Sequence, residues 1–527
     1  MSSIDPVTLE VIRNALTATA EGMSLTVMRC ARSPLLREAG DLSSALTDAS
    51  GELVAQGRDI PMHLGVMAFT VKEFLKRVPP GALHAGDVWF LNLPECGGNH
   101  LPDVKAIQPI FHSGALQAFA VSLAHWADIG GAVPGSYVAN ATDAWQEGLR
   151  IAPLRLFAAE GPDREKLDFV LANVRGQEER EGDIMAQMAA TRMADERLQE
   201  IFREHGVETV QAAMNAMHEN SAQIMREVIR RLPPGPLLGE DFLDDDGVSP
   251  DRIAVRVRMT FADGIGTFDF SASDDAARGP VNTTPFITAA GVLYAMNCLA
   301  ADDDACRTGG ALRPLRIITR PGSLLEPGAD RPVVGGNHET SQRIVDAIFR
   351  GLESVIPDRL SAGGPTTSGL LLFSFKDERG RRVTLYETHG GGEGARADRD
   401  GMPVLRVHMS NVMNTPAEII EAEYPLRILR QELRRNSGGS GRHRGGDGLR
   451  REYLVLATEG TLTSMFDRRV IPPYGLQGGV PGAPFHCTLT RADGSAFEIP
   501  GKSNIALRAG DRVLMESSGG GGYGTTP

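Results

Sequence analysis

A long helical stretch near the middle of the chain constrains the fold most. In residues 183–232 apolar side chains recur at the three- and four-residue spacing of a helix with one buried face, and Gly206 separates two helices within it. The run Pro233-Pro234-Gly235-Pro236 ends the stretch, because proline lacks a backbone N–H and clashes with the preceding helical turn. We therefore predict two regions, 1–240, which ends in this helical segment, and 241–527.

Strand and helix patterns are mixed along the rest of the chain. A capped helix is predicted from Asp5 to about Arg32, a buried strand at 87–91, and further helices near 286–300 and 340–355. Alternating apolar residues around an Asp-Gly turn predict a hairpin within 253–270, and glycine-rich turns separate short apolar runs from Asn436 onward. Because strands and helices do not alternate strictly, we predict an α+β fold of several mixed layers, with a metal-bearing N-terminal region, a central helical segment and a β-rich C-terminal half.

Charge and cysteine content exclude several classes of protein. The net charge is −13, which disfavours nonspecific nucleic-acid binding, and no uncharged apolar run is long enough to span a membrane. The five cysteines are scattered and form no Cys-x-x-Cys pair, and the N-terminus does not resemble a signal peptide. We expect a cytoplasmic protein that binds neither nucleic acid nor membrane.

Familiar catalytic signatures are missing. The sequence has no Gly-x-Ser-x-Gly elbow and no His-Glu-x-x-His motif. Gly501-Lys502-Ser503 resembles the end of a P-loop but lacks its first glycine, and the glycine run 519–524 is interpreted as a turn or a flexible tail. We therefore predict that the chain has no nucleotide site of its own.

Two His-x-x-Asp motifs carry the most chemical information. His100 and Asp103 form the first, His125 and Asp128 the second, and a hairpin predicted across 107–121 would bring the two motifs side by side. Imidazoles and carboxylates that converge are the usual ligands of zinc, manganese or ferrous iron. Composition alone predicts about 1.5 matches to such a spacing, so hydrogen-bonded turn histidines remain an alternative interpretation.

Sequence motifs spread over nearly the whole chain resemble those of one protein family. They include 97–136, with both His-x-x-Asp motifs, and the segments 146–151, 173–175, 182–183, 278–282, 335–343, 390–396, 414–416, 424–427, 437–439 and 519–524. The chain resembles the B-type subunit of the hydantoinase/oxoprolinase family, which includes the acetone and acetophenone carboxylases. It departs from the family at Leu93-Pro94-Glu95-Cys96, where an Asp-Pro-Tyr-like sequence is usual.

The resemblance implies a set of site residues. It implies that Asp41, His100, Asp103 and His125 bind a divalent metal, zinc, manganese or iron. Asp128 would then orient a ligand or act as a base beside the metal, and His63 would line the substrate pocket. A histidine in an apolar setting is equally typical of a structural role. Three further histidines beside glycine-rich loops are weaker pocket candidates, namely His338, His389 and His408.

The resemblance also implies a reaction. An A-type partner subunit would use ATP to phosphorylate the carbonyl of a small cyclic amide, and this chain would complete the ring opening as a catalytic subunit of a hetero-oligomer. The absence of a P-loop fits that division of labour. Two alternatives remain open: a subunit of an ATP-dependent ketone carboxylase, and a noncatalytic scaffold subunit.

Overall fold

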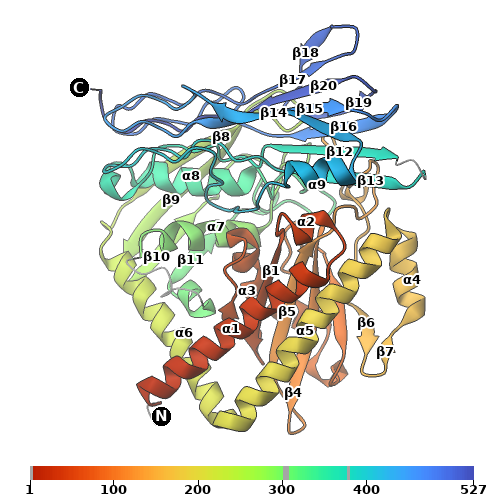
Figure 1. Cartoon of the computed structure of the whole chain (residues 1–527). Helices are drawn as coiled ribbons and strands as arrows, with labels where there is room; N and C mark the ends of the chain where they lie inside the picture. Colours follow the sequence, from red (N-terminus) through yellow and green to blue (C-terminus); the bar gives the residue numbers. More distant parts are fainter. Residues whose placement is uncertain (1–3, 301–307, 377–379, 527) are drawn as a thin grey trace.

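The chain folds as several layers of helix and sheet, an α+β fold (Figure 1). The computed structural model describes residues 4–300, 308–376 and 380–526. The described residues contain nine α-helices: α1 (Pro6–Cys30), α2 (Pro34–Arg37), α3 (Pro61–Arg77), α4 (Arg164–Ala172), α5 (Gln177–His205), α6 (Val207–Arg230), α7 (Pro285–Asn297), α8 (Thr340–Leu352) and α9 (Ala417–Glu423). The predicted helices are confirmed, including the break at Gly206, and the Asp5 carboxylate caps α1 by accepting a hydrogen bond from the Thr8 N–H at 2.9 Å.

A seven-stranded antiparallel sheet forms the N-terminal half. Its order is β2 (Leu53–Gln56), β1 (Leu42–Asp48), β5 (Ala115–His125), β4 (Asp103–His112), β3 (Val88–Leu91), β6 (Leu154–Ala158) and β7 (Gly161–Pro162). The predicted strand at 87–91 is β3, and the predicted hairpin is β4–β5 with Gly114 in its turn.

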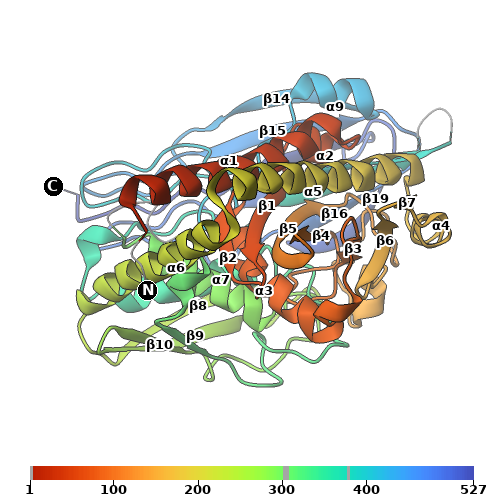
Figure 2. The same ribbon diagram turned by 90° about the horizontal axis from the view of Figure 1, so that it is seen from below.

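Helices cover both faces of this sheet. Successive side chains of a strand point to opposite faces, so each strand packs against both helical layers. In β5, Ala118, Ala120 and Ala124 face the core shared with α1 and α5. The intervening Phe119, Val121 and Leu123 face α3. Figure 2 shows α1 and α5 side by side across the first face. The two strands that end near the His-x-x-Asp motifs are therefore packed between helices on both faces.

Three further sheets make up the C-terminal half. The first runs β11 (Leu315–Ile318), β10 (Ile265–Asp269), β9 (Ile253–Ala262) and β8 (Leu237–Leu243), and includes the predicted 253–270 hairpin. The second runs β13 (Arg382–Glu387), β12 (Leu370–Lys376), β16 (Gly460–Met465) and β19 (Lys502–Leu507). The third runs β14 (Leu426–Arg434), β15 (Gly448–Val455), β20 (Arg512–Glu516), β17 (His486–Thr490) and β18 (Ala496–Glu498).

The C-terminal glycine run is part of the interior. Gly519 to Gly522 are buried, and the N–H of Gly521 donates to the Gly363 carbonyl at 2.8 Å. A Cβ on Gly521 would lie 1.9 Å from the Tyr474 carbonyl oxygen, so only glycine fits this close backbone approach. The prediction of a turn or flexible tail is therefore wrong, because buried backbone groups of neighbouring loops hold the segment through hydrogen bonds.

One apolar core joins residues from both sides of position 240, with Met62, Tyr137 and Met225 in the same cluster as Val257 and Tyr523. The division into 1–240 and 241–527 stays a sequence prediction. Among the residues that the structure describes, no helix combines the length and apolar character needed to cross a bilayer.

Candidate metal centre

The β4–β5 hairpin brings three predicted ligands together. Asp103 begins β4 and pairs in register with His125, which ends β5. The Nδ1 atom of His125 lies 2.8 Å from Asp103 Oδ1, and the Nε2 atom of His100, in the turn before β4, lies 3.0 Å from the same oxygen. His125 of the second motif therefore meets the first motif because of strand register, as the predicted hairpin implied.

Two further predicted residues complete the cluster from neighbouring elements. Asp41 precedes β1, and its backbone carbonyl accepts a hydrogen bond from the His125 N–H at 3.0 Å. The Asp41 side chain lies beside the same histidine, with Oδ2 4.0 Å from His125 Nδ1. His63 lies in the first turn of α3, with Nε2 3.3 Å from Asp103 Oδ2 and 3.9 Å from Asp41 Oδ1. Ser43 Oγ lies 3.2 Å from His63 Nδ1 and helps to fix the ring. Asp41, His63, His100, Asp103 and His125 thus form what we call the Asp103 cluster.

The donor set of the Asp103 cluster suits a divalent cation. One ligand atom each of His100, Asp103 and His125 lies within 4.8 Å of the others. The Nε2 atom of His125 is buried and has no hydrogen-bond partner, although buried polar atoms are nearly always paired. Two imidazoles and a carboxylate, with the Asp41 carboxylate beside them, match the nitrogen and oxygen preference of zinc, manganese and ferrous iron.

Burial and mutual charge shift the pKa values of the cluster. Burial alone would raise the pKa of Asp103, but the His100 and His63 imidazoles outweigh it and hold that pKa well below its ordinary value. Burial lowers the pKa of His100, against the opposing carboxylate of Asp103. For His63 burial also acts downward, but the Asp103 carboxylate outweighs it and raises the pKa. The cluster thus favours an ionised aspartate surrounded by imidazoles.

Two residues next to Asp103 support it. The side-chain amide of Asn99 donates to Asp103 Oδ2, and the Lys105 ammonium donates to Asn99 Oδ1 at 2.9 Å and to the Asp103 carbonyl at 3.1 Å. Burial lowers the pKa of Lys105 to about 8, although the Asp103 carboxylate opposes the shift. This chain of hydrogen bonds fixes the orientation of the aspartate.

Asp128 lies in a different network. Its Oδ1 atom accepts the Gly130 N–H at 2.8 Å, its Oδ2 atom accepts the Gly135 N–H at 2.7 Å, and Arg175 Nη1 lies 3.2 Å from Oδ2. The structure does not bring this carboxylate into contact with the Asp103 cluster among the described residues. Instead, Asp128 closes the loop that follows β5.

The motif analysis missed a group of aromatic hydroxyls beside the cluster. The Tyr137 hydroxyl lies 2.5 Å from His338 Nε2, and the Tyr386 hydroxyl lies 3.2 Å from the same atom. His338 Nδ1 lies 2.7 Å from Ser368 Oγ, and its ring centre is 5.3 Å from that of His100. Burial, with the neighbouring imidazoles, holds the pKa of His338 well below its ordinary value, so the neutral ring accepts from a tyrosine. No local motif marks these tyrosines, because the fold gathers them from separate segments.

Of the three weaker candidates, only His338 reaches the cluster in the described contacts. The Nδ1 atom of His389 lies 2.7 Å from the Gly369 carbonyl oxygen, and its Nε2 atom lies 2.7 Å from the Tyr453 hydroxyl. His408 Nε2 lies 3.5 Å from Asp346 Oδ1 in a separate charged network.

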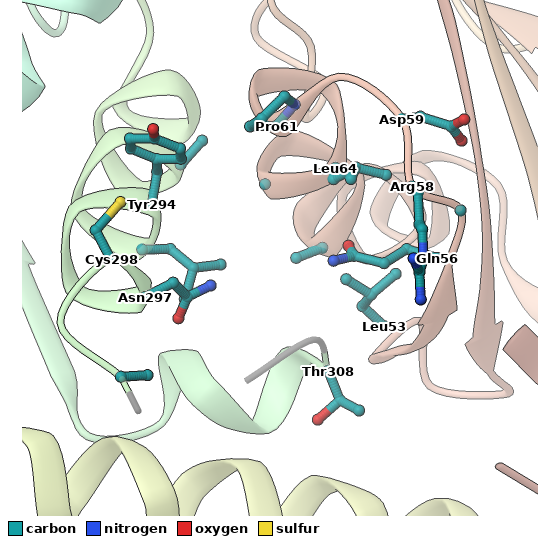
Figure 3. Close-up of a pocket in the computed structure, with 16 residues that line it drawn as sticks. Leu53, Gln56, Arg58, Asp59, Pro61, Leu64, Tyr294, Asn297, Cys298 and Thr308 are labelled. Carbon is teal, nitrogen blue, oxygen red and sulfur yellow. The ribbon is translucent and has the colours of Figure 1, made fainter. Parts of the chain in front are cut away.

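A cavity of about 430 Å³ lies between α3 and α7 (Figure 3). Tyr294, Asn297 and Cys298 line it from α7 and the residue after it, and Figure 3 shows Pro61 and Leu64 of α3 facing them. The α3 residues that line it recur at helical spacing, whereas His63 points from another face of the helix to Asp103. Helix α3 therefore separates the cavity from the Asp103 cluster and contacts both.

Nearly the whole chain resembles known protein sequences. Residues 5–526 match the family model described as Hydantoinase B/oxoprolinase. The chain is 31% identical over 547 residues to 5-oxoprolinase 1 of Arabidopsis thaliana, covering 99% of this chain and 42% of that protein. It is 30% identical over 545 residues to the putative B-type subunit of a D-/L-hydantoinase of Pseudomonas sp. (strain NS671), covering 99% and 90%. The chain thus spans less than half of the plant relative but most of the bacterial one.

Two solved structures share the fold. An ATP-dependent caprolactamase from Pseudomonas jessenii matches with a TM-score of 0.92 at 27% identity, covering 99% of this chain and 92% of that chain. Acetone carboxylase in its nucleotide-free form matches with a TM-score of 0.90 at 20% identity, covering 99% and 76%. At 20% identity the second likeness concerns the fold alone.

Proposed function

We propose a function for this chain from one premise: it belongs to the hydantoinase B/oxoprolinase family. The chain acts as the metal-bearing catalytic B-type subunit of an ATP-dependent cyclic-amide hydrolase. The observation that carries this proposal is the buried Asp103 cluster, in which even the Asp41 residue is only 4% exposed. The names of the hydantoinase, 5-oxoprolinase and caprolactamase relatives support a cyclic amide as the substrate.

Asp41, His100, Asp103 and His125 would hold the divalent cation. Such an ion supplies Lewis-acid polarisation of a carbonyl group or of water when bound. The chain's own contribution is to fix these donors before the substrate arrives: Asn99 and Lys105 hold Asp103, and the Val334 carbonyl, 3.2 Å from His100 Nδ1, accepts a hydrogen bond from that nitrogen. A His100 ring that donates through Nδ1 carries a lone pair on Nε2, 3.0 Å from Asp103 Oδ1, and both atoms would bind the cation.

Residues around the cluster bind and transfer the protons. His63 sits between the Asp41 and Asp103 carboxylates and holds a proton beside them. Tyr137 donates to His338, and the His338 Nδ1–H donates to Ser368, so the orientation of the tyrosine hydroxyl is fixed through the imidazole. These groups can give a proton to the departing ring nitrogen and take one from the attacking water.

The reaction balances with two waters and one ATP. Transfer of the ATP γ-phosphoryl group to the amide oxygen makes the carbonyl carbon a better electrophile. Water adds to that carbon, the C–N bond breaks with the nitrogen taking a proton, and an acyl phosphate remains. A second water then gives the carboxylate and inorganic phosphate. Burial of the cluster excludes bulk water from this sequence.

ATP chemistry is assigned to an A-type partner subunit, and the two chains form a hetero-oligomer. The sequence of this chain carries no P-loop, and the bacterial relative that it spans for 90% of its length has the name of a B-type hydantoinase subunit. Asp128 has a positioning role in this proposal: by fixing the loop after β5 it holds the His125 end of the strand.

Reconstitution tests the proposal. The purified chain is mixed with a purified A-type protein of the same family, and ring opening of hydantoin, 5-oxoproline and caprolactam is measured together with ADP release. We expect ring opening only with both chains and ATP, and little from either alone. Robust hydrolysis by the isolated chain without ATP would contradict the division of labour.

Two further readouts separate the alternatives. Turnover that needs bicarbonate and a ketone would favour the carboxylase. For the scaffold, His100→Ala is compared with the unmodified chain in the same complex: we expect intact assembly by size-exclusion chromatography and loss of ring opening. Unchanged activity in His100→Ala would favour the scaffold.

A further inference from the structure

A second group of possible ligands lies away from the Asp103 cluster. Asp48 ends β1, Glu52 lies in the turn before β2, and His218 lies in the middle of α6. One ligand atom of each residue lies within 4.8 Å of the others. The turn and the helix are far apart in sequence, so the fold alone brings this group together.

His218 is the unusual member. It is fully buried, and neither of its ring nitrogens has a hydrogen-bond partner. Its Nε2 atom points to Asp48 Oδ2 at 3.7 Å, which is too long for a hydrogen bond. A buried imidazole with no hydrogen bond and only this one long carboxylate contact is poorly compensated for its lost water, so there is room for a partner between the ring and the carboxylate.

Each of the two carboxylates brings one oxygen within 4.8 Å of a His218 ring nitrogen. Asp48 Oδ1 is occupied by the Ser50 N–H, the Ser50 hydroxyl and the Glu52 N–H at 2.8, 2.7 and 2.9 Å, which leaves Oδ2 facing the imidazole. Glu52 meets Arg313 through both oxygens at 3.0 and 2.9 Å. A carboxylate offers about four acceptor positions, so this ion pair leaves Glu52 able to bind a cation as well.

Close packing fixes the group. A Cβ on Gly309 would lie 2.8 Å from Glu52 Cγ, and a Cβ on Gly310 would lie 1.9 Å from the His218 carbonyl oxygen. These two glycines let one short segment pack directly against the turn on one side and α6 on the other. The side chains of Asp48 and Glu52 remain 23% and 16% exposed, so water can reach the group and complete a coordination shell.

We propose that Asp48, Glu52 and His218 bind a divalent transition-metal ion at a second site, which ties α6 to the β1–β2 turn. One imidazole nitrogen and two carboxylate oxygens suit zinc, manganese or iron rather than calcium or magnesium, which prefer oxygen ligands only. The site stands apart from the reaction, so the inference does not rest on the proposed function.

Metal counting tests the second site without any activity assay. The His100→Ala/His125→Ala double variant removes the first site, and Zn²⁺ or Mn²⁺ alone is titrated into this background, with the bound metal measured by mass spectrometry after dialysis. We expect about one ion per chain. Adding His218→Gln should remove it, with at least about tenfold weaker binding. The matched control is His205→Gln, a histidine at the end of α5 outside the group, which should keep the ion.

A melting experiment covers the case in which His218→Gln folds poorly. In the same double-variant background, Zn²⁺ should raise the melting temperature, and Glu52→Gln, at the exposed rim of the group, should reduce this rise. A double-variant background that binds no ion would overturn the proposal and leave His218 as a plain ion-pair partner of Asp48. Retention of the full metal content in both His218→Gln and Glu52→Gln would overturn it equally.

Discussion

Two buried charged clusters in this chain are built in opposite ways. In the first, which we call the arginine network, Arg343 and Arg468 meet Asp241 and Asp346, with Arg468 Nη2 at 2.6 and 2.7 Å from the two carboxylates. In the Asp103 cluster, the ion-pair partners of the two aspartates are imidazoles. Both clusters are almost completely buried.

The difference lies in what each cluster lacks. In the arginine network two permanent, fully buried cations match two carboxylates, and the more exposed Arg350 guanidinium lies 3.5 Å from Asp241 Oδ1. The Asp103 cluster pairs its two carboxylates with imidazoles, which carry no permanent charge, and His125 Nε2 has no hydrogen bond, so a bound proton or cation can complete it. A buried cluster held by permanent charges of both signs is typical of structure, whereas one whose charge balance depends on a bound proton or cation is typical of a binding site.

The largest effect is expected from breaking the arginine network. Asp241→Asn removes one of the two buried carboxylates that neutralise Arg343 and Arg468. The buried guanidinium groups cannot release a proton to restore the balance. We expect the free energy of unfolding to fall by about 3–5 kcal/mol. Urea unfolding measures this. An exposed aspartate provides the control: Asp275→Asn, where the side chain is 86% exposed, should change stability by less than about 0.5 kcal/mol.

The same substitution in the Asp103 cluster should affect binding far more than folding. Asp103→Asn keeps the shape of the side chain but removes the central carboxylate, and the surrounding imidazoles can become neutral, which arginines cannot. We expect metal affinity and partner-dependent turnover to fall at least about a hundredfold. The loss of unfolding free energy in the metal-free protein should be smaller than for Asp241→Asn. If Asp103→Asn instead unfolds the protein and Asp241→Asn abolishes metal binding, the contrast between the two clusters is wrong.

Low pH sharpens the comparison. His408, Arg468 and Arg343 outweigh burial and hold the pKa of Asp346 far below its ordinary value, so this carboxylate stays ionised at a pH where an ordinary aspartate takes up a proton. A buried neutral imidazole behaves differently. Burial, with Arg451 nearby, lowers the pKa of His389 to about 3, and its ring nitrogens already pair with the Gly369 carbonyl and the Tyr453 hydroxyl.

The sign of the His389 effect follows from proton uptake. Below pH 6.5 the unfolded chain binds a proton at this histidine while the folded protein does not, so stability is complete above that pH and declines as the pH falls toward 3. Between pH 7 and pH 5 the loss from His389 should be about 2 kcal/mol. His389→Gln can donate and accept in the same places and should make the pH profile shallower by that amount. An unchanged profile would show that His389 is protonated in the folded state.

Sequence reasoning reached the Asp103 cluster because three of its residues, His100, Asp103 and His125, lie at the ends of two neighbouring strands. The predicted hairpin brings His125 to Asp103, and the family resemblance implied Asp41 as a ligand and His63 as a pocket residue. Tyr137 and Tyr386 could not be found in this way, since they come from a loop and a strand distant in sequence, and only tertiary packing sets them beside His338. The tightly packed glycine run was missed for the same reason, because its partners are backbone atoms of other loops.

The smallest effect is expected at the cavity between α3 and α7. A substitution there tests whether substrate entry can be changed without changing metal binding at the Asp103 cluster. Leu64 is 9% exposed and lines this cavity, whereas His63 beside it contacts Asp103. If the cavity admits the substrate, Leu64→Trp fills it and should raise KM by about threefold to tenfold, while metal content and kcat stay unchanged. Leu75→Phe, on the same helix but outside the cavity lining, serves as the control. A lower metal content in Leu64→Trp would show that the two faces of α3 are coupled, and an unchanged KM would place the substrate route elsewhere.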